Sequence, residues 1–442
     1  SDAAGAFYGA MTLRQIQRQC KDALPACEIE DWPDFPKRGL MLDISRNKVP
    51  TMETLRALVD RLAQWKFNQF QLYTEHTFAY SAHPDVWRDA SPMTGEQVRE
   101  LDAFCRQRHV ELVPNQNSFG HMERWLRHPA YRRLAENEDN LLTLAPTAES
   151  LAFVQGLYRE LLPHFASPLF NIGCDETWEL GTGRSRADCE RRGKGRVYLD
   201  YLAALCRFVQ GMGRKPMFWG DIILKHPELI PELPPGVVAL LWGYEADQPR
   251  DEDAERFARA GVPFYVCPGA GGWNSIVGRA ETALPNLLRA AQAGRRHGAV
   301  GYLVTEWGDN GHWQHDPIPL LGFARGAALA WAADANRDRP LPPALSLHAF
   351  ADATGQSGAA LFDLEHAQAR AGVPLPNQSI LHRLLLHPDD ELPAGLTAEG
   401  LEAVADVVSR ALASLAGARM RRPDARLVES ELHNGAGLAS HA

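Results

Sequence analysis

From Pro168 to Glu176 the chain reads Pro-Leu-Phe-Asn-Ile-Gly-Cys-Asp-Glu, an apolar run that ends in two adjacent carboxylates. An apolar run this short, closed by a glycine, predicts a buried β-strand followed by a loop. Adjacent acids in different surroundings can keep a proton donor and a permanent anion in one site. The alternative is a turn with two solvated acids, because Asp and Glu side chains are mostly exposed. The rest of the chain decides between these interpretations.

The run over residues 168–173 is one of eight β-rich runs along the chain. The others cover residues 39–43, 68–73, 110–114, 215–219, 237–242, 262–267 and 300–305. Amphipathic segments with helical spacing lie between most of them, at residues 52–65, 94–108, 148–162, 196–212, 251–260 and 280–296. This alternation indicates a parallel sheet, and eight units predict an α/β fold of the (β/α)8 TIM barrel type. In the fifth unit, the prolines between residues 226 and 235 predict a short helix or a loop.

The pattern changes at both ends of the predicted barrel. After residue 336, helical spacing recurs at residues 341–353, 359–371 and 396–420, and no strand is evident. We therefore predict an N-terminal segment over residues 1–36 with one helix over 12–23, a barrel over 37–336, and a helical C-terminal region over 337–442. The role expected for the C-terminal region is packing or oligomerisation, which leaves a homo-oligomer open.

The composition excludes several classes of partner. The chain has 442 residues, of which 45% are hydrophobic, enough for a large buried core. Its net charge of -9 and pI near 6.0 come without a basic stripe, so we predict no nucleic-acid partner. No apolar stretch reaches the length that spans a bilayer, and we predict no membrane association.

The cysteines indicate the compartment. Seven cysteines are scattered along the chain without CxxC spacing. This disfavours a zinc site and a disulfide framework and favours a reducing compartment, so we expect a cytoplasmic protein. Because the sequence starts at Ser1-Asp2 without a Met, removal of an upstream segment, and therefore secretion, is left open.

Polar and aromatic side chains follow the predicted strands, where the loops of such a barrel build an active site. They are Arg46, Glu75, His76, Asn115, Asn117, His121, Asp175, Glu176, Trp178, Trp219, Asp221, Trp242, Tyr244, Glu245, Trp273, Asn274, Glu306, Trp307 and Asp309. Aromatic rings beside acids suit a sugar, because its C–H faces stack on indole while its hydroxyls need fixed hydrogen-bond partners. Each tryptophan alone is also compatible with ordinary packing, Arg46 with a salt bridge, and Asp309 with a turn.

Other chemistries find less support. His312 and His315 have i, i+3 spacing, but no HExxH motif or third ligand accompanies them, so we predict no metal. The chain has no GxSxG elbow. The glycines at 269, 271 and 272 do not form a GxGxxG motif that opens a helix, so we predict no cofactor.

Two motifs within residues 38–335 resemble the catalytic barrel of glycoside hydrolase family 20, the β-N-acetylhexosaminidases. The segment from Arg38 to Arg46, Arg-Gly-Leu-Met-Leu-Asp-Ile-Ser-Arg, is similar to the first-strand signature of that family. The segment from Asn171 to Glu176 resembles its Asp-Glu signature. Residues 6–13 look like the tail of the α/β helper domain that precedes the barrel in many members, so the N-terminal segment is interpreted as a short remnant of that domain.

The resemblance implies a mechanism and a substrate. Glu176 matches the general acid and base of the family, and Asp175 matches the residue that orients the 2-acetamido group of the substrate. That group attacks the anomeric carbon and forms an oxazolinium intermediate, so the enzyme retains the configuration by substrate-assisted catalysis. The expected activity is exo-acting removal of a terminal GlcNAc or GalNAc, with no cofactor.

Further positions match substrate-binding residues of the family. Arg46 matches the arginine that binds the 3- and 4-hydroxyls, and Asp309 stands where an acid binds the 4- and 6-hydroxyls. Trp219, Trp242 and Trp307 resemble the tryptophans around the sugar and its acetamido group, and His121 matches a histidine after the third strand. The seventh loop lacks the customary tyrosine that binds the acetamido oxygen; Tyr244, or Trp273 with Asn274, is the substitute that we expect. Asn117 also departs from the family, because many members have an acid there.

Two alternatives remain open from the sequence. A conventional retaining glycosidase would use Glu176 as acid and Glu306 as nucleophile, which leaves Asp175 without a role. A non-catalytic sugar-binding barrel would keep the tryptophans and have no need of the acid pair.

Overall fold

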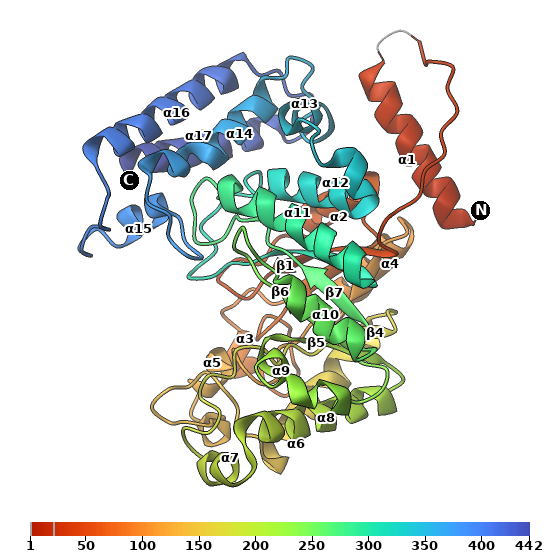
Figure 1. Cartoon of the computed structure of the whole chain (residues 1–442), viewed down its shortest axis with the longest axis vertical. Coiled ribbons are helices and arrows are strands. Elements are labelled where there is room, and N and C mark those ends of the chain that lie inside the picture. Colours follow the sequence, from red (N-terminus) through yellow and green to blue (C-terminus); the bar gives the residue numbers. More distant parts are fainter. Residues whose placement is uncertain (1, 21–22) are drawn as a thin grey trace.

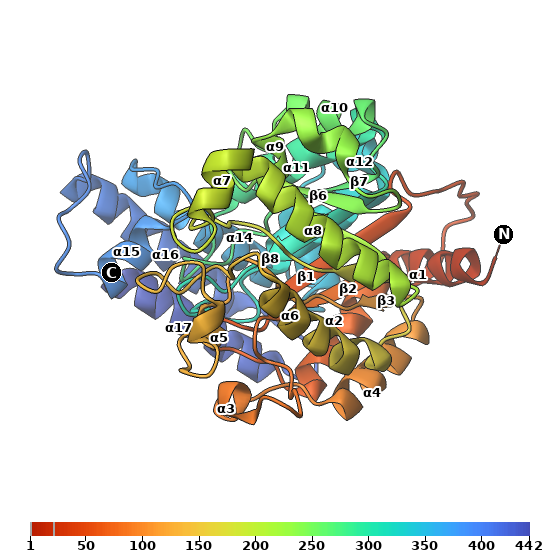
Figure 2. The same cartoon turned by 90° about the horizontal axis from the view of Figure 1, so that it is seen from below.

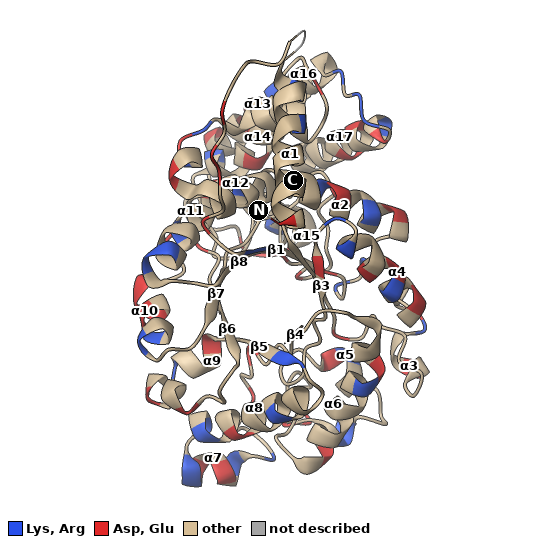
Figure 3. Cartoon of the chain, turned by 90° about the vertical axis from the view of Figure 1, so that its right-hand side faces the viewer, with Lys and Arg blue, Asp and Glu red and all other residues tan. Residues whose placement is uncertain are grey.

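The computed structural model describes residues 2–20 and 23–442, and its centre is a ring of eight parallel strands (Figures 1 and 3). They are β1 (Lys37–Asp43), β2 (Gln69–Tyr73), β3 (Glu111–Val113), β4 (Leu169–Asn171), β5 (Lys215–Trp219), β6 (Val238–Trp242), β7 (Phe264–Cys267) and β8 (Gly301–Glu306). Hydrogen-bonded neighbours run in the order β3-β2-β1-β8-β7-β6-β5-β4. Between β3 and β4 the Asn171 N–H donates to Pro114 O, and the Gln116 N–H donates to Asn171 O, both at 2.9 Å. The predicted TIM barrel is confirmed.

The predicted helices cover the outside of the ring. They are α2 (Met52–Gln64), α4 (Gly95–Arg106), α6 (Ala148–Leu161), α8 (Lys194–Gly211), α10 (Asp251–Arg259) and α11 (Ala280–His297). Threonine side chains cap α2, α4 and α6 by accepting a backbone N–H of the first turn. The fifth unit contains the four-residue α9 (Asp221–Leu224) and a 3-10 turn over Pro227–Glu232, which confirms the short element that the prolines predict.

One barrel helix has no sequence prediction. It is α12 (Leu320–Asn336), which follows β8 and is rich in alanine and glycine, so its apolar and polar faces contrast little. Gly326 explains part of that composition, because a Cβ there would lie 2.4 Å from Val304 Cγ2. The small residues let α12 lie close to the sheet. Three short helices complete the barrel loops: α3 (Pro84–Trp87), α5 (Glu123–Leu126) and α7 (Arg186–Arg192).

Side chains fill the inside of the ring. An apolar cluster formed by inward-facing residues of the strands contains Met41, Tyr73, Val113, Met217, Leu240 and Leu303. A Cβ at Gly39 would lie 2.7 Å from Leu303 Cδ1, so this interior position has no room for a side chain. The buried Gln71 Oε1 accepts hydrogen bonds from the amides of Asn115 and Asn171, each at 3.1 Å, which ties β2 to β3 and β4. The interior is therefore a packed core that carries the site at one end.

The region after residue 336 is helical, as predicted. It contains α13 (Leu341–His348), α14 (Gln356–Ala367), α15 (Ile380–Leu386), α16 (Ala398–Gly417) and α17 (Ala425–His441), and no strand is assigned among its residues. In Figures 1 and 2 these helices lie beside the barrel, with α14 against α11. The Ser379 N–H donates to Asn274 O at 2.9 Å, so the segment before α15 reaches the loop after β7.

The N-terminal helix differs from its prediction. It is α1 (Ala3–Gln19), which begins nine residues before the predicted start because Asp2 caps it through the Gly5 N–H at 2.7 Å. Residues 21 and 22 of the predicted helix lie outside the described residues. The helix packs on the barrel, where Tyr8 meets Trp331 edge-on and Gln15 donates to Gln64 O at 3.0 Å. No helix among the described residues is both long and apolar enough to cross a membrane.

Candidate active site

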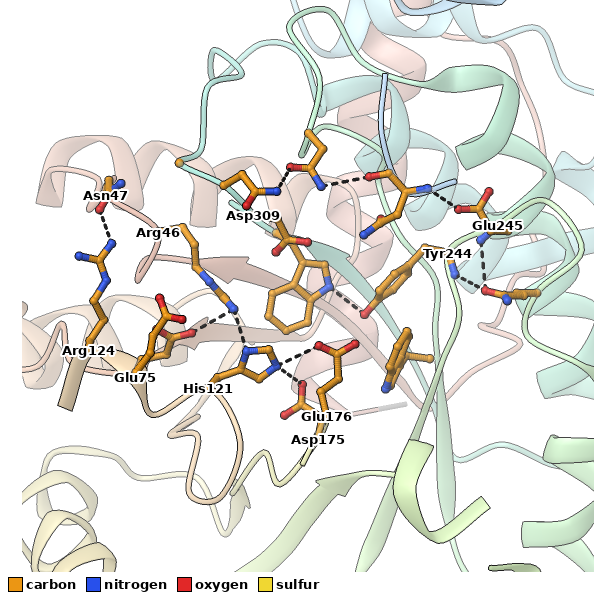
Figure 4. Close-up of a pocket in the computed structure, with 18 of the residues that line it drawn as sticks. Arg46, Asn47, Glu75, His121, Arg124, Asp175, Glu176, Tyr244, Glu245 and Asp309 are labelled. Atoms are coloured by element: carbon orange, nitrogen blue, oxygen red, sulfur yellow. Dashed lines mark hydrogen bonds and ion pairs between the residues drawn. The ribbon is translucent and has the colours of Figure 1, made fainter. Parts of the chain in front are cut away.

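A cavity of about 650 Å³ opens at the carboxyl ends of the strands (Figure 4). Of the eleven residues to which the sequence assigns a catalytic or substrate-binding role, nine line it: Arg46, His121, Asp175, Glu176, Trp242, Tyr244, Asn274, Trp307 and Asp309. The remaining two, Trp219 and Trp273, do not line it and are almost completely buried. The barrel therefore brings together residues that lie up to 263 positions apart, from Arg46 to Asp309.

The loop after β4 turns sharply so that both acids face the cavity. Gly173, Cys174 and Glu176 have φ values of +68°, +70° and +47°, in the left-handed region that non-glycine residues seldom adopt. A Cβ at Gly173 would lie 2.4 Å from Asn117 Oδ1, so a glycine is required there. The same Asn117 oxygen accepts the Cys174 N–H at 3.1 Å and holds the turn.

Asp175 is a buried anion with two fixed partners. The Asn117 Nδ2 group donates to Asp175 Oδ1 at 2.9 Å, and His121 Nε2 lies 3.3 Å from Asp175 Oδ2. Burial raises the pKa of Asp175, but the charge and hydrogen bond of His121 together with the Asn117 amide outweigh it, and the net pKa is lowered. Asp175 therefore carries a negative charge at neutral pH.

Glu176 differs from its neighbour in exposure. Its side chain is 33% exposed, against 7% for Asp175, and its Oε2 lies 3.3 Å from His121 Nε2. Its backbone N–H donates to Asp221 Oδ2 at 3.1 Å. The partly buried Asp221 has a pKa raised to about 7 by the burial of its carboxyl group and by the negative charge of Asp175. The sequence places Asp221 after β5 without a role; here it holds the backbone of Glu176.

His121 links the two acids. Burial lowers the pKa of His121, but the negative charge of Asp175 and hydrogen bonds to both acids raise it well above its usual value. The imidazole is therefore charged at neutral pH and compensates Asp175. The loop that carries His121 packs on the acid loop, because a Cβ at Gly120 would lie 2.2 Å from Asp175 O.

Two buried acids hold Arg46. Its Nη1 lies 2.8 Å from Asp43 Oδ2, and its Nη2 lies 3.0 Å from Glu75 Oε1. Burial lowers the pKa of Arg46, but the charges of Asp43 and Glu75 outweigh it and raise the pKa further. The Asp43 Oδ2 atom also accepts the Gly308 N–H at 3.0 Å, which joins β1 to the loop after β8. Arg46 therefore makes the salt bridges that the sequence allows and still lines the cavity.

Aromatic side chains form the opposite wall. Trp242 and Tyr244 stack with ring centroids 5.1 Å apart, and Trp307 Nε1 donates to Tyr244 Oη at 2.7 Å. Trp219 lies behind Trp307, with centroids 5.9 Å apart. Trp273 meets Tyr244 edge-on from outside the cavity. Trp219 and Trp273 therefore support the aromatic wall from behind.

The C-terminal region contributes a residue that the sequence does not predict. Asn377, in the segment before α15, lines the cavity. Its backbone N–H donates to Glu245 Oε1 at 2.8 Å, and its Oδ1 accepts the Trp273 indole N–H at 2.8 Å. No sequence signal marks this residue, because only the folded chain brings it beside the β6 and β7 loops.

Glu306 faces away from the cavity. It is completely buried, its Oε1 accepts from Gln314 Nε2 at 2.6 Å, and its Oε2 accepts the Gly272 N–H at 3.3 Å. Burial raises the pKa of Glu306 to about 8. A neutral, enclosed carboxyl group is unsuited to act as a nucleophile.

The described residues contain no group of three or more His, Cys, Asp or Glu side chains that could hold a metal ion. His312 is mostly enclosed, and burial lowers its pKa to about 4. Asn434 Nδ2 lies 2.8 Å from His315 Nε2. These two histidines therefore lie in different surroundings, and the described residues around them do not form a shared metal site.

Comparison with known families agrees with this geometry. The model of "Glycosyl hydrolase family 20, catalytic domain" matches residues 35–271. The chain belongs to glycosyl hydrolase family 20. The match includes Arg46, His121, Asp175 and Glu176, and ends before the loop after β8.

Proteins similar to this chain carry hexosaminidase names. Human hexosaminidase D is 27% identical over 299 residues, which are 63% of this chain and 61% of that protein. A β-hexosaminidase of Akkermansia muciniphila is 26% identical over 265 residues, 50% of this chain and 53% of the relative. The chain thus spans just over half to about three-fifths of the length of these two relatives.

Solved structures share the fold. The crystal structure of a β-N-acetylhexosaminidase from Bacteroides fragilis has a TM-score of 0.59 and 22% identity, covering 75% of this chain and 73% of that chain. The chitobiase of Flavobacterium johnsoniae has a TM-score of 0.65 and 16% identity, covering 98% of this chain and 76% of the chitobiase chain. Because both identities are below 25%, these similarities show a shared fold only.

Proposed function

We propose that the protein is an exo-acting β-N-acetylhexosaminidase that releases a terminal N-acetylhexosamine with retention of configuration. The observation that carries the proposal is the pair Asp175 and Glu176. One is a buried anion and the other a half-buried acid, and both lie 3.3 Å from His121 at the floor of an aromatic-walled cavity. Membership of family 20 and the hexosaminidase names of the relatives support the same activity.

The proposed reaction has two steps. In the first, the acetamido oxygen of the substrate attacks C1, the bond from C1 to the leaving oxygen breaks, and Glu176 gives that oxygen a proton. Asp175 accepts the acetamido N–H and stabilises the positive charge of the oxazolinium ring. In the second step, water attacks C1, Glu176 takes the proton of the water, and the ring opens to the free sugar.

His121 supports the different roles of Asp175 and Glu176. Its positive charge holds Asp175 in the anionic form that a cationic intermediate needs. Asn117 supplies an amide donor to the same carboxylate, which fixes its orientation without adding a second acid. An asparagine therefore suits this position as part of the proposed mechanism.

The walls of the cavity suit the rest of the sugar. Arg46 is assigned to the 3- and 4-hydroxyls and Asp309 to the 4- and 6-hydroxyls, while Trp242 and Trp307 offer indole surface to the ring and the acetamido group. Tyr244 is assigned to the acetamido oxygen. Its hydroxyl oxygen accepts the Trp307 N–H, so its own proton stays available to donate.

The two alternatives explain less of the geometry. A conventional retaining mechanism needs a nucleophile at the cavity, and Glu306 is enclosed elsewhere with a raised pKa. A binding module has no use for a buried anion that is compensated by a histidine next to a more exposed acid.

Kinetics on matched nitrophenyl substrates test the proposal. We expect turnover of the β-linked GlcNAc or GalNAc compound and a kcat/KM at least about 10³-fold lower for the glucose compound, because glucose lacks the attacking amide. The ratio of the kcat/KM values for the GlcNAc and GalNAc compounds gives the preference of the enzyme for one configuration of the 4-hydroxyl. Similar kcat/KM values for the glucose and N-acetyl compounds would overturn the proposal.

A further inference from the structure

One end of the active-site cavity extends past Arg46. Its lining includes four residues without a role in the proposed reaction: Asn47, Glu123, Arg124 and Arg127. In Figure 4, Arg46 lies between Arg124 on one side and Asp309 and Glu176 on the other. Because Arg46 is assigned to the 3- and 4-hydroxyls, this end of the cavity lies on the side of those hydroxyls and is remote from the bond that is cleaved.

The short helix α5 holds Arg124 at this end. Its residues Trp125 and Leu126 are completely buried, and Trp125 Nε1 donates to Glu75 O at 2.7 Å. The carboxylate of Glu75 in turn lies 3.0 Å from Arg46 Nη2. The neighbour of Arg124 in the chain is therefore fixed in the core beside the partner of Arg46, while Arg124 itself stays partly exposed at the cavity wall.

Arg124 and Asn47 together offer hydrogen-bond donors. Arg124 Nη2 donates to Asn47 Oδ1 at 2.8 Å. A guanidinium group has no acceptor, so the amide oxygen of Asn47 faces Arg124 and its Nδ2 group remains as a second donor. Guanidinium and amide N–H groups are the donors that bind the oxygens of sulfate, phosphate and carboxylate groups.

This end of the cavity carries one positive charge that no acid compensates. Among the described residues no carboxylate pairs with Arg124, and Glu123 pairs instead with Arg127, whose Nη2 lies 3.8 Å from Glu123 Oε1. His76 adds no charge, because burial and the charges of Arg124 and Arg46 lower its pKa to about 4. A neutral sugar has no group that would use the charge of Arg124.

We propose that this end of the cavity binds an anionic group on the 3-hydroxyl of the terminal N-acetylhexosamine, through Arg124 and Asn47. The group is a sulfate, a phosphate or the carboxylate of an ether, which share a negative charge and acceptor oxygens. The 3-hydroxyl is the one that Arg46 reaches and Asp309 does not, and Asp309 lies across Arg46 from Arg124. The proposal rests on the proposed function and adds a substrate class to it.

The test compares nitrophenyl GlcNAc with four compounds that differ only at the 3-hydroxyl: the sulfate, the phosphate, the 1-carboxyethyl ether and the neutral methyl ether. In wild type, kcat/KM for the best anionic compound should be roughly 10-fold above that for the methyl ether, which is the effect of one charged hydrogen bond. The ranking of the three anions shows which of them the site prefers.

Substitution of Arg124 should remove this preference. Arg124→Ala should bring the best anionic compound close to the methyl ether and leave unsubstituted nitrophenyl GlcNAc within about twofold of wild type. Arg124→Lys keeps the charge and should keep part of the preference. The matched control is Arg133→Ala, which removes the same charge from a position that is 61% exposed and outside the cavity, and it should change no compound.

Three results would overturn the anion site: no hydrolysis of any 3-substituted compound, a methyl ether that is cleaved as well as the best anion, or a preference unchanged in Arg124→Ala. A wild-type protein that hydrolyses no N-acetylhexosaminide would instead contradict the proposed function. Calorimetry with GlcNAc and its 3-sulfate, 3-phosphate and 3-(1-carboxyethyl) ether then tests the site. Tighter binding of an anionic sugar that Arg124→Ala abolishes supports the site, and equal binding of all four sugars overturns it.

Discussion

Buried acids in this protein differ in charge at neutral pH: Asp175 is an anion, whereas Glu306 and Glu365 are neutral. Asp175 has a lowered pKa because His121 and Asn117 face its oxygens. Glu306 and Glu365 are equally buried, but no cation is placed against them; both pKa values are raised, that of Glu306 to about 8. The difference shows that burial alone makes an acid neutral, and that an acid at the site stays charged only where the fold supplies a cation and a donor.

The largest effect is expected where the acid acts chemically. Glu176→Gln should lower turnover of substrates with poor leaving groups by roughly 10²- to 10⁴-fold and of those with good leaving groups much less, because the lost proton matters only for the former. Steady-state kinetics on a series of aryl glycosides measures this. The matched control is Glu306→Gln, which should stay near wild type in the folded enzyme. An equal loss for both kinds of leaving group would contradict the role of Glu176.

A smaller loss is expected at Arg46. Arg46→Lys should lower kcat/KM by roughly 10- to 100-fold, because one ammonium group lacks the fork that reaches both Asp43 and Glu75 while it faces the substrate. The loss should lie mainly in KM for the nitrophenyl GlcNAc compound. Arg61→Lys on the outer helix α2 serves as control. Wild-type KM in Arg46→Lys would show that the guanidinium binds no hydroxyl.

Asn117 tests what keeps Asp175 charged. Asn117→Asp replaces the amide donor by an acid, and of two carboxyl groups at hydrogen-bond distance one has a strongly raised pKa. The acidic limb of the kcat/KM profile should therefore move up by roughly one pH unit or more. Asn117→Ala removes the donor without adding an acid and should move that limb less. Identical profiles for wild type and Asn117→Asp would contradict the assignment of Asp175 as the essential anion.

The smallest effect on activity is expected from the neutral acids. Glu365 has a raised pKa from burial, and neither carboxyl oxygen has a hydrogen-bond partner among the described residues. The folded state thus holds a proton that the unfolded state releases above about pH 4.5. Stability should fall as the pH rises from there toward the folded pKa, by about 1.4 kcal/mol for each unit between the two pKa values.

Glu365→Met should flatten this fall without changing kcat. Thermal unfolding at pH 5 and pH 8 measures it, and the difference in Tm between the two should shrink in the variant. Glu399→Gln, at an exposed position of α16, should keep the wild-type difference. A Tm difference unaffected by Glu365→Met would show that this carboxyl is charged in the folded protein.

The sequence predicts the barrel well because each strand combines an apolar run with a polar loop. Thus β4 and the acids after it follow from residues 168–176, and nine predicted residues meet at one cavity. The other features of the site could not be predicted, because they depend on contacts between residues far apart in the sequence. Asn377 and α15 reach the cavity only through packing, and Glu306 has the same strand-end position as the site acids while its side chain turns outward to Gly272.

The tryptophans at the strand ends also show that the sequence does not predict the direction of a side chain. Trp219 ends β5 and Trp307 directly follows β8, but only Trp307 faces the cavity and Trp219 supports it from behind. A strand-end position indicates which end of the barrel a residue occupies, whereas the direction of its side chain depends on neighbours in the ring.

Inhibition by an N-acetylglucosamine thiazoline, which mimics the oxazolinium ring, tests the central claim most directly. If the substrate amide attacks C1 and Asp175 stabilises the ring, the thiazoline should bind wild type competitively and far more tightly than GlcNAc, and Asp175→Asn should lose most of that advantage. Thiazoline binding no tighter than that of GlcNAc, or unchanged by Asp175→Asn, would contradict the account.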